Sequence, residues 1–310
     1  MSAQQNLVYN GDFEIYDTCP NTTSYPGNYQ IEHCLGWYAP TYATSDYYNS
    51  CASSIVGVPA NNFGFQYPYS GNAYCGLYIQ NCTQPSCNGW WVEYIQTKLI
   101  NPLNNGTRYS FSFKIVGSDY GFDYYFWKLG AYFTKSKITS TTAKPFVNIT
   151  PQVLNQKNNY LTDTLNWVEI KGSFIAQGQE EYLTIGYFPD TLNIDTLREY
   201  NVTNDITNFG NYYFIDDLKL YEEECENKLP NVFTPNGDNI NDAFKVNLCN
   251  SLMFSLTIYN RWGIKILETD KVSNGWDGRT TSGNECEDGV YFYYIDTEKE
   301  KYKGFVHLIR

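Results

Sequence analysis

Every second residue from Tyr109 to Ile115 is large and apolar, and this alternation constrains the fold more than any other feature of the chain. The residues between them are two serines and a lysine, so one face of an extended segment is apolar and the other is polar. Comparable runs occupy residues 129–133, 167–174 and 182–188. No stretch shows the periodicity of a long amphipathic helix. We therefore expect an all-β fold, with a hairpin at Gly178–Glu181 joining the last two runs.

Two strand-like sequences open and close the first part of the chain. Asn6–Glu14 contains Asn-Gly-Asp-Phe-Glu, and Tyr212–Tyr221 reads Tyr-Tyr-Phe-Ile-Asp-Asp-Leu-Lys-Leu-Tyr. In this order they resemble the first and last strands of galactose-binding-like jelly rolls, the fold of many carbohydrate-binding modules. The resemblance covers roughly residues 6–221 and implies a jelly-roll β-sandwich in residues 1–224. The acidic stretch Glu222–Asn227 marks the expected domain boundary.

The part of the chain from Leu229 onward has a strand pattern of its own. Apolar residues alternate over 254–259, and a turn at Asn260–Gly263 leads into a second run. Aromatic and β-branched residues then gather at 290–295 and again at 305–309. Short strands separated by Gly, Asn and Asp predict a small Ig-like β-sandwich. We expect its last strand to lie inside a sheet.

Four motifs in this part follow one another in a familiar order. They are Leu229–Asp242, Phe254–Gly263 with its Asn-Arg-Trp-Gly turn, Gly275–Gly278 and Asp288–Tyr294. Their order and spacing resemble the gliding-motility-associated C-terminal domain of Bacteroidetes, the type B (CHU_C-like) sorting domain of type IX secretion. The resemblance implies that residues 229–310 are an export and surface-anchoring signal for the passenger before them. The implied partners are the type IX translocon and an outer-membrane barrel protein of the PorP/SprF kind.

The terminal strand is the expected sorting signal, because a strand edge is a natural docking surface. It comprises Gly304, Phe305, Val306, His307, Leu308, Ile309 and Arg310. Met1–Gln5 resembles the stub beside a cleavage site, so we expect a leader peptide that is absent from this chain. The expected location is the outer-membrane surface of a Gram-negative bacterium.

The formal net charge of −12 disfavours nucleic acid and anionic lipid as partners, because few cations are left to neutralise phosphate groups. No apolar run approaches the length of a membrane span, so no transmembrane segment is expected.

Nine cysteines in an exported chain predict disulfide bonds rather than zinc sites. Paired C-x2-C spacings are missing, and His33 and His307 are the only histidines, so zinc has no clear ligand set. The expected pairs are Cys19 with Cys34, Cys82 with Cys87, by elimination Cys51 with Cys75, and Cys249 with Cys286. Cys225 is then the odd thiol, although a bond between Cys225 and Cys249 is an alternative.

Calcium is the one metal that the jelly-roll resemblance implies. In that family a structural calcium often lies where the first strand meets the last, which corresponds here to Glu14 with Asp216 or Asp217. Carboxylates supply the hard oxygen ligands that calcium requires. The alternative is a solvated acidic edge.

The loop Asn236–Asp242 is a second calcium candidate, because Asp238 and Asp242 are spaced like oxygen ligands. It lacks the distal glutamate of an EF-hand. We favour the alternative, a loop whose Asx side chains accept hydrogen bonds from its own backbone.

Exposed aromatic rings are the expected contacts for a saccharide, since they stack on the C–H faces of sugars. The candidates are Trp90 and Trp91, and Asp123, Tyr124, Tyr125 and Trp127 from the acid-interrupted stretch 120–127. The alternative is that these rings fill the core. Trp167, within an alternating run, is expected in the core.

Catalysis has little support in the sequence. A glycosidase needs two placed carboxylates, and Glu93 and Glu169 stand isolated. No G-x-S-x-G motif or phosphate-binding loop is present. We therefore expect a non-enzymatic binding or adhesion protein. A structural subunit of a surface polymer and a polysaccharide-degrading enzyme are the alternatives.

Overall fold

The computed structural model describes most of the chain in two compact units, Met1–Glu223 and Glu224–Arg310. The described residues are 4–53, 55–82, 89–120, 124–192, 196–198, 208–223, 227–238, 240–246, 248, 254–270, 275–297 and 300–310. Among them the only helical element is the four-residue 3-10 turn η1 (Gln30–His33), and strands dominate both units. The predicted all-β fold is confirmed.

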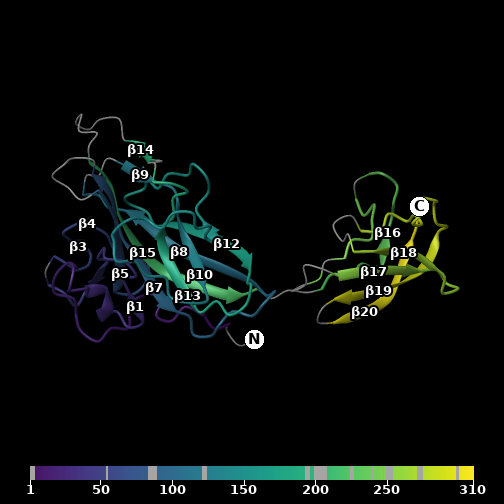
Figure 1. Ribbon diagram of the computed structural model, residues 1–310, viewed down its shortest axis with the longest axis horizontal. Helices are drawn as coiled ribbons and strands as arrows, with labels where there is room; N and C mark the ends of the chain where they lie inside the picture. Colours follow the sequence, from purple (N-terminus) through teal and green to yellow (C-terminus); the bar gives the residue numbers. More distant parts are fainter. Residues whose placement is uncertain are drawn as a thin grey trace. The chain divides into compact units, whose positions relative to one another are not determined.

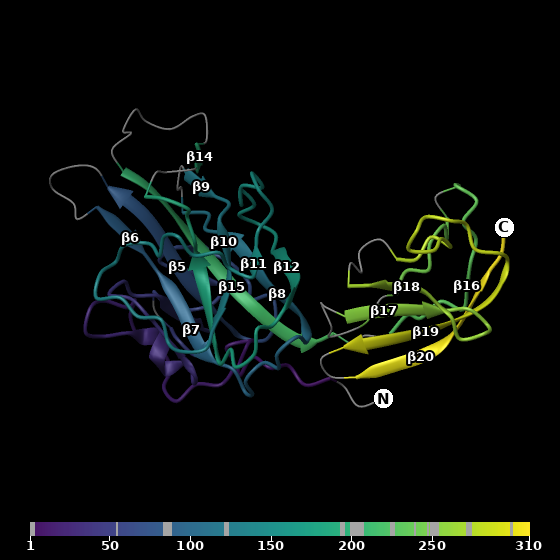
Figure 2. The same cartoon turned by 45° about the vertical axis from the view of Figure 1, so that its right-hand side comes forward.

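The N-terminal unit is a sandwich of two antiparallel sheets, which can be followed in Figures 1 and 2. The first sheet has the order β1 (Trp37–Tyr38), β7 (Tyr94–Lys98), β13 (Tyr182–Tyr187), β10 (Leu129–Thr134) and β11 (Val153–Leu154). The second has the order β12 (Val168–Ile175), β8 (Arg108–Gly117), β15 (Asn208–Glu222), β5 (Ala73–Cys82) and β2 (Asp46–Asn49), with β6 (Trp90–Val92) paired to β5. Two small ribbons, β3 (Ala60–Asn61) with β4 (Gly64–Phe65) and β9 (Tyr124–Phe126) with β14 (Thr196–Arg198), complete it.

Aromatic rings from both sheets meet in the core. Phe133 of the first sheet stacks on Phe174 at 4.6 Å between ring centroids and meets Phe111 edge-on at 5.3 Å. The alternating face of β8 from Tyr109 to Ile115 is buried, as its period of two predicts. Strands of both sheets therefore alternate between the shared core and an outer face.

The predicted hairpin at Gly178–Glu181 is wrong. β12 belongs to the second sheet and β13 to the first, so the connection between them crosses from one layer to the other. The alternation of each strand defines a buried face but not the sheet to which the strand belongs.

The N-terminal segment is joined to β15 by the side chain of Asn6. Its amide group donates to the carbonyl oxygen of Leu218 (2.8 Å), and its oxygen accepts from the N–H of Leu220 (2.9 Å). A Cβ at Gly11 would lie 2.3 Å from the Leu218 oxygen, so only glycine permits this approach. Asn6–Glu14 therefore meets β15, but the strand predicted there is wrong, since only Val8 pairs, in an isolated bridge to Leu99.

A bulge interrupts β15 between Asp216 and Lys219. Asp217 has a φ of 54°, a left-handed conformation that aspartate tolerates better than most residues. The inserted residue shifts the alternation, so Leu218 enters the core while Lys219 and Tyr221 belong to the outer face.

One disulfide bond joins described cysteines, and it links Cys19 to Cys51 with 6.0 Å between their Cα atoms. The predicted pairs of Cys19 with Cys34 and of Cys51 with Cys75 are therefore wrong. Cys34 and Cys75 are free thiols in the hydrophobic core, where each packs as a small apolar side chain.

Cys286 is also a buried free thiol, so its predicted bond to Cys249 is wrong. It belongs to the core cluster of the C-terminal unit, and burial raises its pKa. The predicted bond between Cys82 and Cys87 and the role of Cys225 depend on side chains outside the described part of the chain.

The C-terminal unit is built on one five-stranded sheet. Its order is β16 (Val232–Phe233), β20 (Lys301–Leu308), β19 (Gly289–Thr297), β17 (Phe254–Tyr259) and β18 (Lys265–Thr269), with β16 parallel to β20 and the other pairs antiparallel (Figures 1 and 2). The terminal strand lies inside the sheet, as predicted. The segments of Phe244 and Trp276, joined by a β-bridge, cover its apolar face through contacts with Tyr293 and Tyr291.

Replacing Cys19 and Cys51 together by Ser should lower the free energy of unfolding of the N-terminal unit by about 3 kcal/mol, because the bond closes a loop of 32 residues. Urea unfolding of wild type and variant measures the difference. Non-reducing peptide mapping should recover a Cys19–Cys51 peptide from wild type. Equal unfolding midpoints, or a different linked peptide, would contradict the assignment.

Candidate functional site

The predicted saccharide platform around Trp127 is wrong, because its rings are buried. Tyr124, Tyr125 and Trp127 are 4%, 7% and 6% exposed, and Trp90 is 9% exposed. All three residues of β9 are buried, so neither face of this short strand is open to a ligand. Asp123 lies outside the described residues.

Trp91 is half-buried and takes part in a buried polar network. Its indole N–H donates to Glu93 Oε1 at 3.0 Å, and Glu93 Oε2 accepts from the N–H of Tyr78 at 2.7 Å. Burial, and then the charge of Asp46 nearby, hold the pKa of Glu93 well above its usual range. The indole N–H therefore has a partner within the protein, and the ring meets Tyr42 edge-on at 6.1 Å.

Asp46 is the second carboxylate of this network. The Tyr212 hydroxyl donates to its Oδ2 at 2.6 Å, and the N–H of Ser24 donates to its Oδ1 at 2.6 Å. Burial raises its pKa to about 6, and these hydrogen bonds oppose the rise. With 4% of its surface exposed, Asp46 is out of reach of a ligand.

The outer face of the first sheet is closed by the segment between β10 and β11. Gln96 and Thr184, which face outward on β7 and β13, are fully buried. The N–H of Phe146 donates to the Tyr94 hydroxyl at 3.1 Å, and the Phe146 ring lies 4.8 Å from the Tyr94 ring. The part of this face around Gln96 and Thr184 is therefore covered.

The outer face of the second sheet is covered only in part. Ala52, Val56, Val58 and Phe63 pack on it in a second hydrophobic cluster. The buried members of this cluster are Tyr48, Val56, Tyr74, Val116, Tyr212 and Phe214. Beyond this cluster the face is open across β12, β8 and β15.

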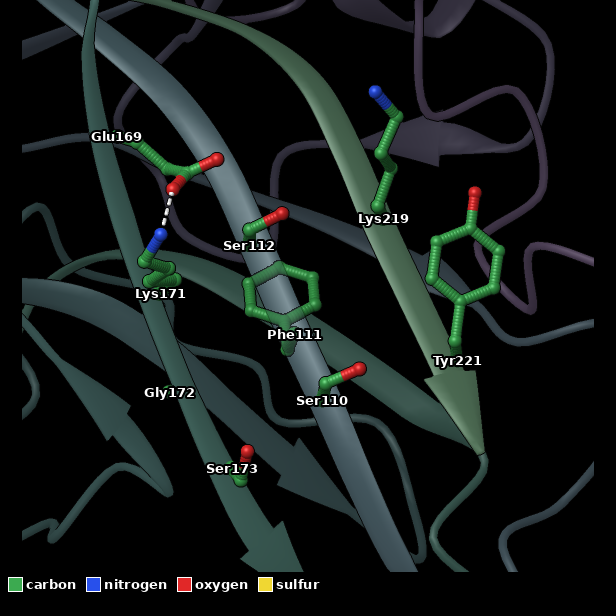
Figure 3. A pocket seen from close by; sticks show the side chains of 9 residues that line it. All are labelled: Ser110, Phe111, Ser112, Glu169, Lys171, Gly172, Ser173, Lys219 and Tyr221. Atoms are coloured by element: carbon green, nitrogen blue, oxygen red, sulfur yellow. Dashed lines mark ion pairs between the residues drawn. The ribbon is translucent and has the colours of Figure 1, made fainter. Parts of the chain in front are cut away.

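The open part forms a shallow groove of about 220 Å3 (Figure 3). The side chains on this side of the sheet make three rows across β15, β8 and β12: Asp216, Lys114 and Glu169; Lys219, Ser112 and Lys171; and Tyr221, Ser110 and Ser173. The last two rows and Glu169 line the groove, whereas Asp216 is buried. Figure 3 shows the two β8 serines flanked by Lys171 and Ser173 on one side and by Lys219 and Tyr221 on the other. The floor therefore combines hydroxyl, ammonium and carboxylate groups.

An exposed aromatic segment reaches the Lys114 row, next to this groove, through Tyr69. Phe65, Tyr67 and Tyr69 are 52%, 65% and 46% exposed. The indole N–H of Trp167 donates to the carbonyl of Tyr67 at 3.0 Å, and its ring meets Tyr69 edge-on. Trp167 is half-buried on the outer face, so its predicted place in the sandwich core is wrong. Lys114 Nζ lies 4.6 Å from the centre of the Tyr69 ring and so connects this aromatic segment to the floor.

Each cation of the groove has an anionic neighbour. Lys171 and Lys114 pair with Glu169 at 2.6 and 3.1 Å, and Lys219 pairs with Asp217 at 2.6 Å. The hydrogen bond from Lys171, and then the one from Lys114, lower the pKa of Glu169 and keep it ionised. A proton donor for glycoside cleavage needs the opposite shift.

The calcium candidates Glu14 and Asp216 hold the same loop. Glu14 accepts from the N–H of Asn72 at 2.6 Å, and Asp216 accepts from the N–H of Ser70 at 2.9 Å. Asp216 is fully buried, and burial raises its pKa to about 7. Asp217 instead pairs with Lys219. No cluster of three Cys, His, Asp or Glu suited to a metal occurs in the described ranges.

In the predicted calcium loop Asn236–Asp242, the described Asx side chains accept hydrogen bonds from the backbone of the loop. Asp238 accepts from the N–H of Ile240 at 2.7 Å, and Asp242 accepts from the N–H of Gly237 at 2.7 Å. The Asn236 side chain accepts from the N–H of Asp238 at 3.1 Å. These oxygens are used by the backbone of the loop itself.

One protein family matches the chain, and it matches the C-terminal unit. Residues 227–308 fit the family described as the CHU_C Type IX secretion signal domain. The chain therefore carries a type IX secretion signal, which marks it as a secreted or cell-surface protein that interacts with the secretion machinery. None of its described helical turns is long and apolar enough to span a membrane.

Several solved structures resemble the chain at low identity, whereas no curated protein matches its sequence. A Clostridium thermocellum xylanase with CBM22 and GH10 modules is 11% identical with a TM-score of 0.31, covering 68% of this chain and 32% of that one. A Bacteroides thetaiotaomicron protein described as sugar-binding is 11% identical with a TM-score of 0.34, covering 71% and 100%. A cleaved adhesin domain of Lys-gingipain from Porphyromonas gingivalis is 11% identical with a TM-score of 0.27, covering 61% and 92%. This chain spans about a third of the xylanase structure. At these scores the likenesses say nothing about ligands.

Sequence reasoning missed the groove residues, although their signal is visible. Ser110, Ser112 and Lys114 are the polar members of the alternating run in β8. The strands on either side of β8 are not neighbours in sequence, so only the sheet order brings Lys171 and Lys219 beside them.

Asp46→Asn should flatten the pH dependence of stability. Because the pKa of Asp46 is about 6 when folded and about 3.9 when unfolded, the folded state holds the extra proton between these values. Wild type should lose up to about 3 kcal/mol through this group as the pH rises from about 4 to about 6. Urea unfolding of both proteins over this range isolates the contribution. Parallel curves for the two proteins would show that Asp46 titrates normally.

Proposed function

We propose that this chain is an exported, non-enzymatic binding protein whose N-terminal unit takes a neutral saccharide in the groove on β12, β8 and β15. The supporting observation is an open polar floor next to the row of Lys114, whose Nζ lies 4.6 Å from the centre of the exposed Tyr69 ring; Tyr67, two residues before it, is also exposed. Such rings stack on the C–H faces of sugars, and groups like those of the floor bond to hydroxyls.

The floor suits hydroxyl groups in particular. Ser110, Ser112 and Ser173 each bring a donor and an acceptor, and Tyr221 brings a phenol. A shallow groove on a sheet face also suits a glycan chain that extends beyond one sugar unit. Because the lysines already have partners, a neutral ligand binds without breaking an ion pair.

Binding without catalysis is favoured by the single carboxylate of the pocket. Glu169 is held ionised by two lysines and has no second accessible acid beside it in the groove. Glycoside hydrolysis uses a pair of carboxyl groups, one of which is protonated.

On the export side, we propose that the partner is an outer-membrane barrel protein of the PorP/SprF kind and that the protein is held at the outer-membrane surface of a Gram-negative bacterium. The terminal strand of the signal contributes to the fold itself. Arg310 Nη1 donates to the carbonyl of Cys286 at 2.6 Å, and Val306 and Leu308 lie in the core. Removing Gly304–Arg310 therefore removes part of the domain as well as a candidate signal.

We also propose that Glu14 and Asp216 hold a calcium ion together with backbone oxygens of the loop that they bind. Two features fit a cation there. Asp216 is a buried carboxylate with no ion pair among the described residues, and the buried hydroxyl of Ser70 beside it has no hydrogen-bond partner. Bound calcium would supply the positive charge that this acid lacks.

Replacing Tyr67 and Tyr69 together by Ala should weaken glycan binding by about tenfold or more, because stacked aromatic residues often dominate such contacts. The ligand is first found by screening the wild-type chain on an array of neutral and acidic glycans. Titration calorimetry then compares wild type, the double variant and Tyr25→Ala, whose 54% exposed ring lies outside the groove. If the double variant bound the glycan with wild-type affinity, the proposal that the saccharide binds at this site would be wrong.

Calcium should raise the melting temperature of wild type relative to chelator, by mass action worth about 3 kcal/mol at a hundredfold excess over Kd. Glu14→Ala should abolish the response. Asp238→Ala is the matched control, because its carboxylate belongs to the Asx-turn loop and the response should persist. Identical melting curves of wild type with calcium and with chelator would argue against the site.

A further inference from the structure

Four large apolar side chains of the C-terminal unit face solvent together. Trp262, Phe305, Phe292 and Val290 are 70%, 51%, 47% and 37% exposed, and we call them the Trp262 patch. Phe292 and Phe305 are direct cross-strand neighbours on β19 and β20. Trp262, Val290 and Phe292 also line a hollow of about 490 Å3 between the turn after β17 and the start of β19. The patch therefore combines a protruding ring with a depression beside it.

The turn that presents Trp262 is fixed by hydrogen bonds. The Asn260 side chain accepts from the N–H groups of Trp262 (3.0 Å) and Ile264 (2.9 Å), and Gly263 has a φ of 76° that suits glycine. The core of the unit does not use this ring, because Trp276 fills it at 1% exposure. An ordered, protruding tryptophan without a role in the core marks an interaction surface.

The charges at this hollow indicate what the partner carries. The Arg261 guanidinium lies 4.4 Å from the centre of the Trp262 ring. Arg261 has no ion pair within the described part of the chain. Two acids also line the hollow, namely Asp288, which pairs with Arg310, and the exposed Glu287. An unpaired cation over an aromatic ring offers a site for a carboxylate next to an apolar group.

We propose that the Trp262 patch is the surface by which the type IX secretion machinery recognises this signal domain. The occupant is a segment of a machinery protein that places an apolar side chain in the hollow and a carboxylate against Arg261. The inference rests on the secretion signal matched at residues 227–308, which requires a protein receptor. It differs from docking at the strand edge, since the patch lies on the sheet face and on the turn.

Surface delivery of the full chain, expressed behind a leader peptide in a type IX host, tests the inference. Trp262→Ser combined with Phe292→Ser should reduce surface protein by roughly tenfold or more, as loss of a binding hot spot does. Ile240→Ser is the matched control, because Ile240 is 66% exposed but lies outside the patch, and its delivery should stay normal. Arg261→Glu leaves the apolar surface intact and should reduce delivery as well. Thermal melting of each purified variant must match that of wild type.

Normal delivery of the folded patch variants would overturn the inference. Deletion of residues 227–310 tests whether the signal domain itself is needed. If the chain without these residues were delivered normally, both the secretion signal and the patch proposal would be wrong. A photo-crosslinking residue at position 262 adds a direct readout, with position 240 as control. Crosslinks to an outer-membrane component of the type IX machinery support the proposal, whereas crosslinks to a second copy of this chain would overturn it.

Discussion

The contact between Asn6 and the bulged part of β15 is the interaction on which the N-terminal unit depends. One carboxamide bonds the carbonyl of Leu218 and the N–H of Leu220, in the part of β15 that extends beyond its pairing with β5, which ends at Ile215. The N-terminal segment of the domain is thereby tied to its last strand. The same bulge reverses the alternation of β15, so Leu218 fills the core while Lys219 and Tyr221 complete the groove. The same bulged part of β15 therefore closes the sandwich and places two residues of the candidate site.

Period-two patterns predicted which side chains are buried but not what covers the other face. The apolar members of β8 lie in the core as expected, because one alternating face must be removed from water. For β9 the prediction of exposed rings rested on the acids that interrupt the stretch 120–127, and it was wrong, because Tyr124 and Tyr125 are buried on opposite faces of a strand that is covered on both. For Trp167 the error was the opposite one. It was predicted in the core but lies on the outer face, where a neighbouring loop half-covers it. Whether a loop folds back over a sheet depends on contacts between residues far apart in sequence, which no local pattern contains.

Cysteine spacing and aromatic motifs likewise did not predict which residues meet in the folded chain. Cys19 and Cys51 are 32 residues apart and meet because the intervening chain folds back, while Cys34 lies in the core between them. In the C-terminal unit, Trp262 precedes a glycine and Trp276 follows one, and the sequence alone does not rank them. The β-bridge of Trp276 to Phe244 draws its ring inward, and the Asn260 turn presents Trp262 to solvent. The order of its motifs was enough to predict the sorting domain from sequence. Which of its aromatic side chains face solvent is visible only in the folded structure.

The distribution of charge around the groove favours a neutral ligand for the saccharide site that we propose. The chain has 21 lysines and arginines against 33 acids, yet Lys114, Lys171 and Lys219 gather on three adjacent strands. Pairing with Glu169 and Asp217 leaves little net charge there, and exposed pairs of this kind contribute little stability. Their effect is to hold ammonium and carboxylate groups in place as donors and acceptors. A saccharide hydroxyl can bond to such a pair without displacing either member, whereas an anionic ligand would have to compete with Glu169 within a chain whose overall charge repels it.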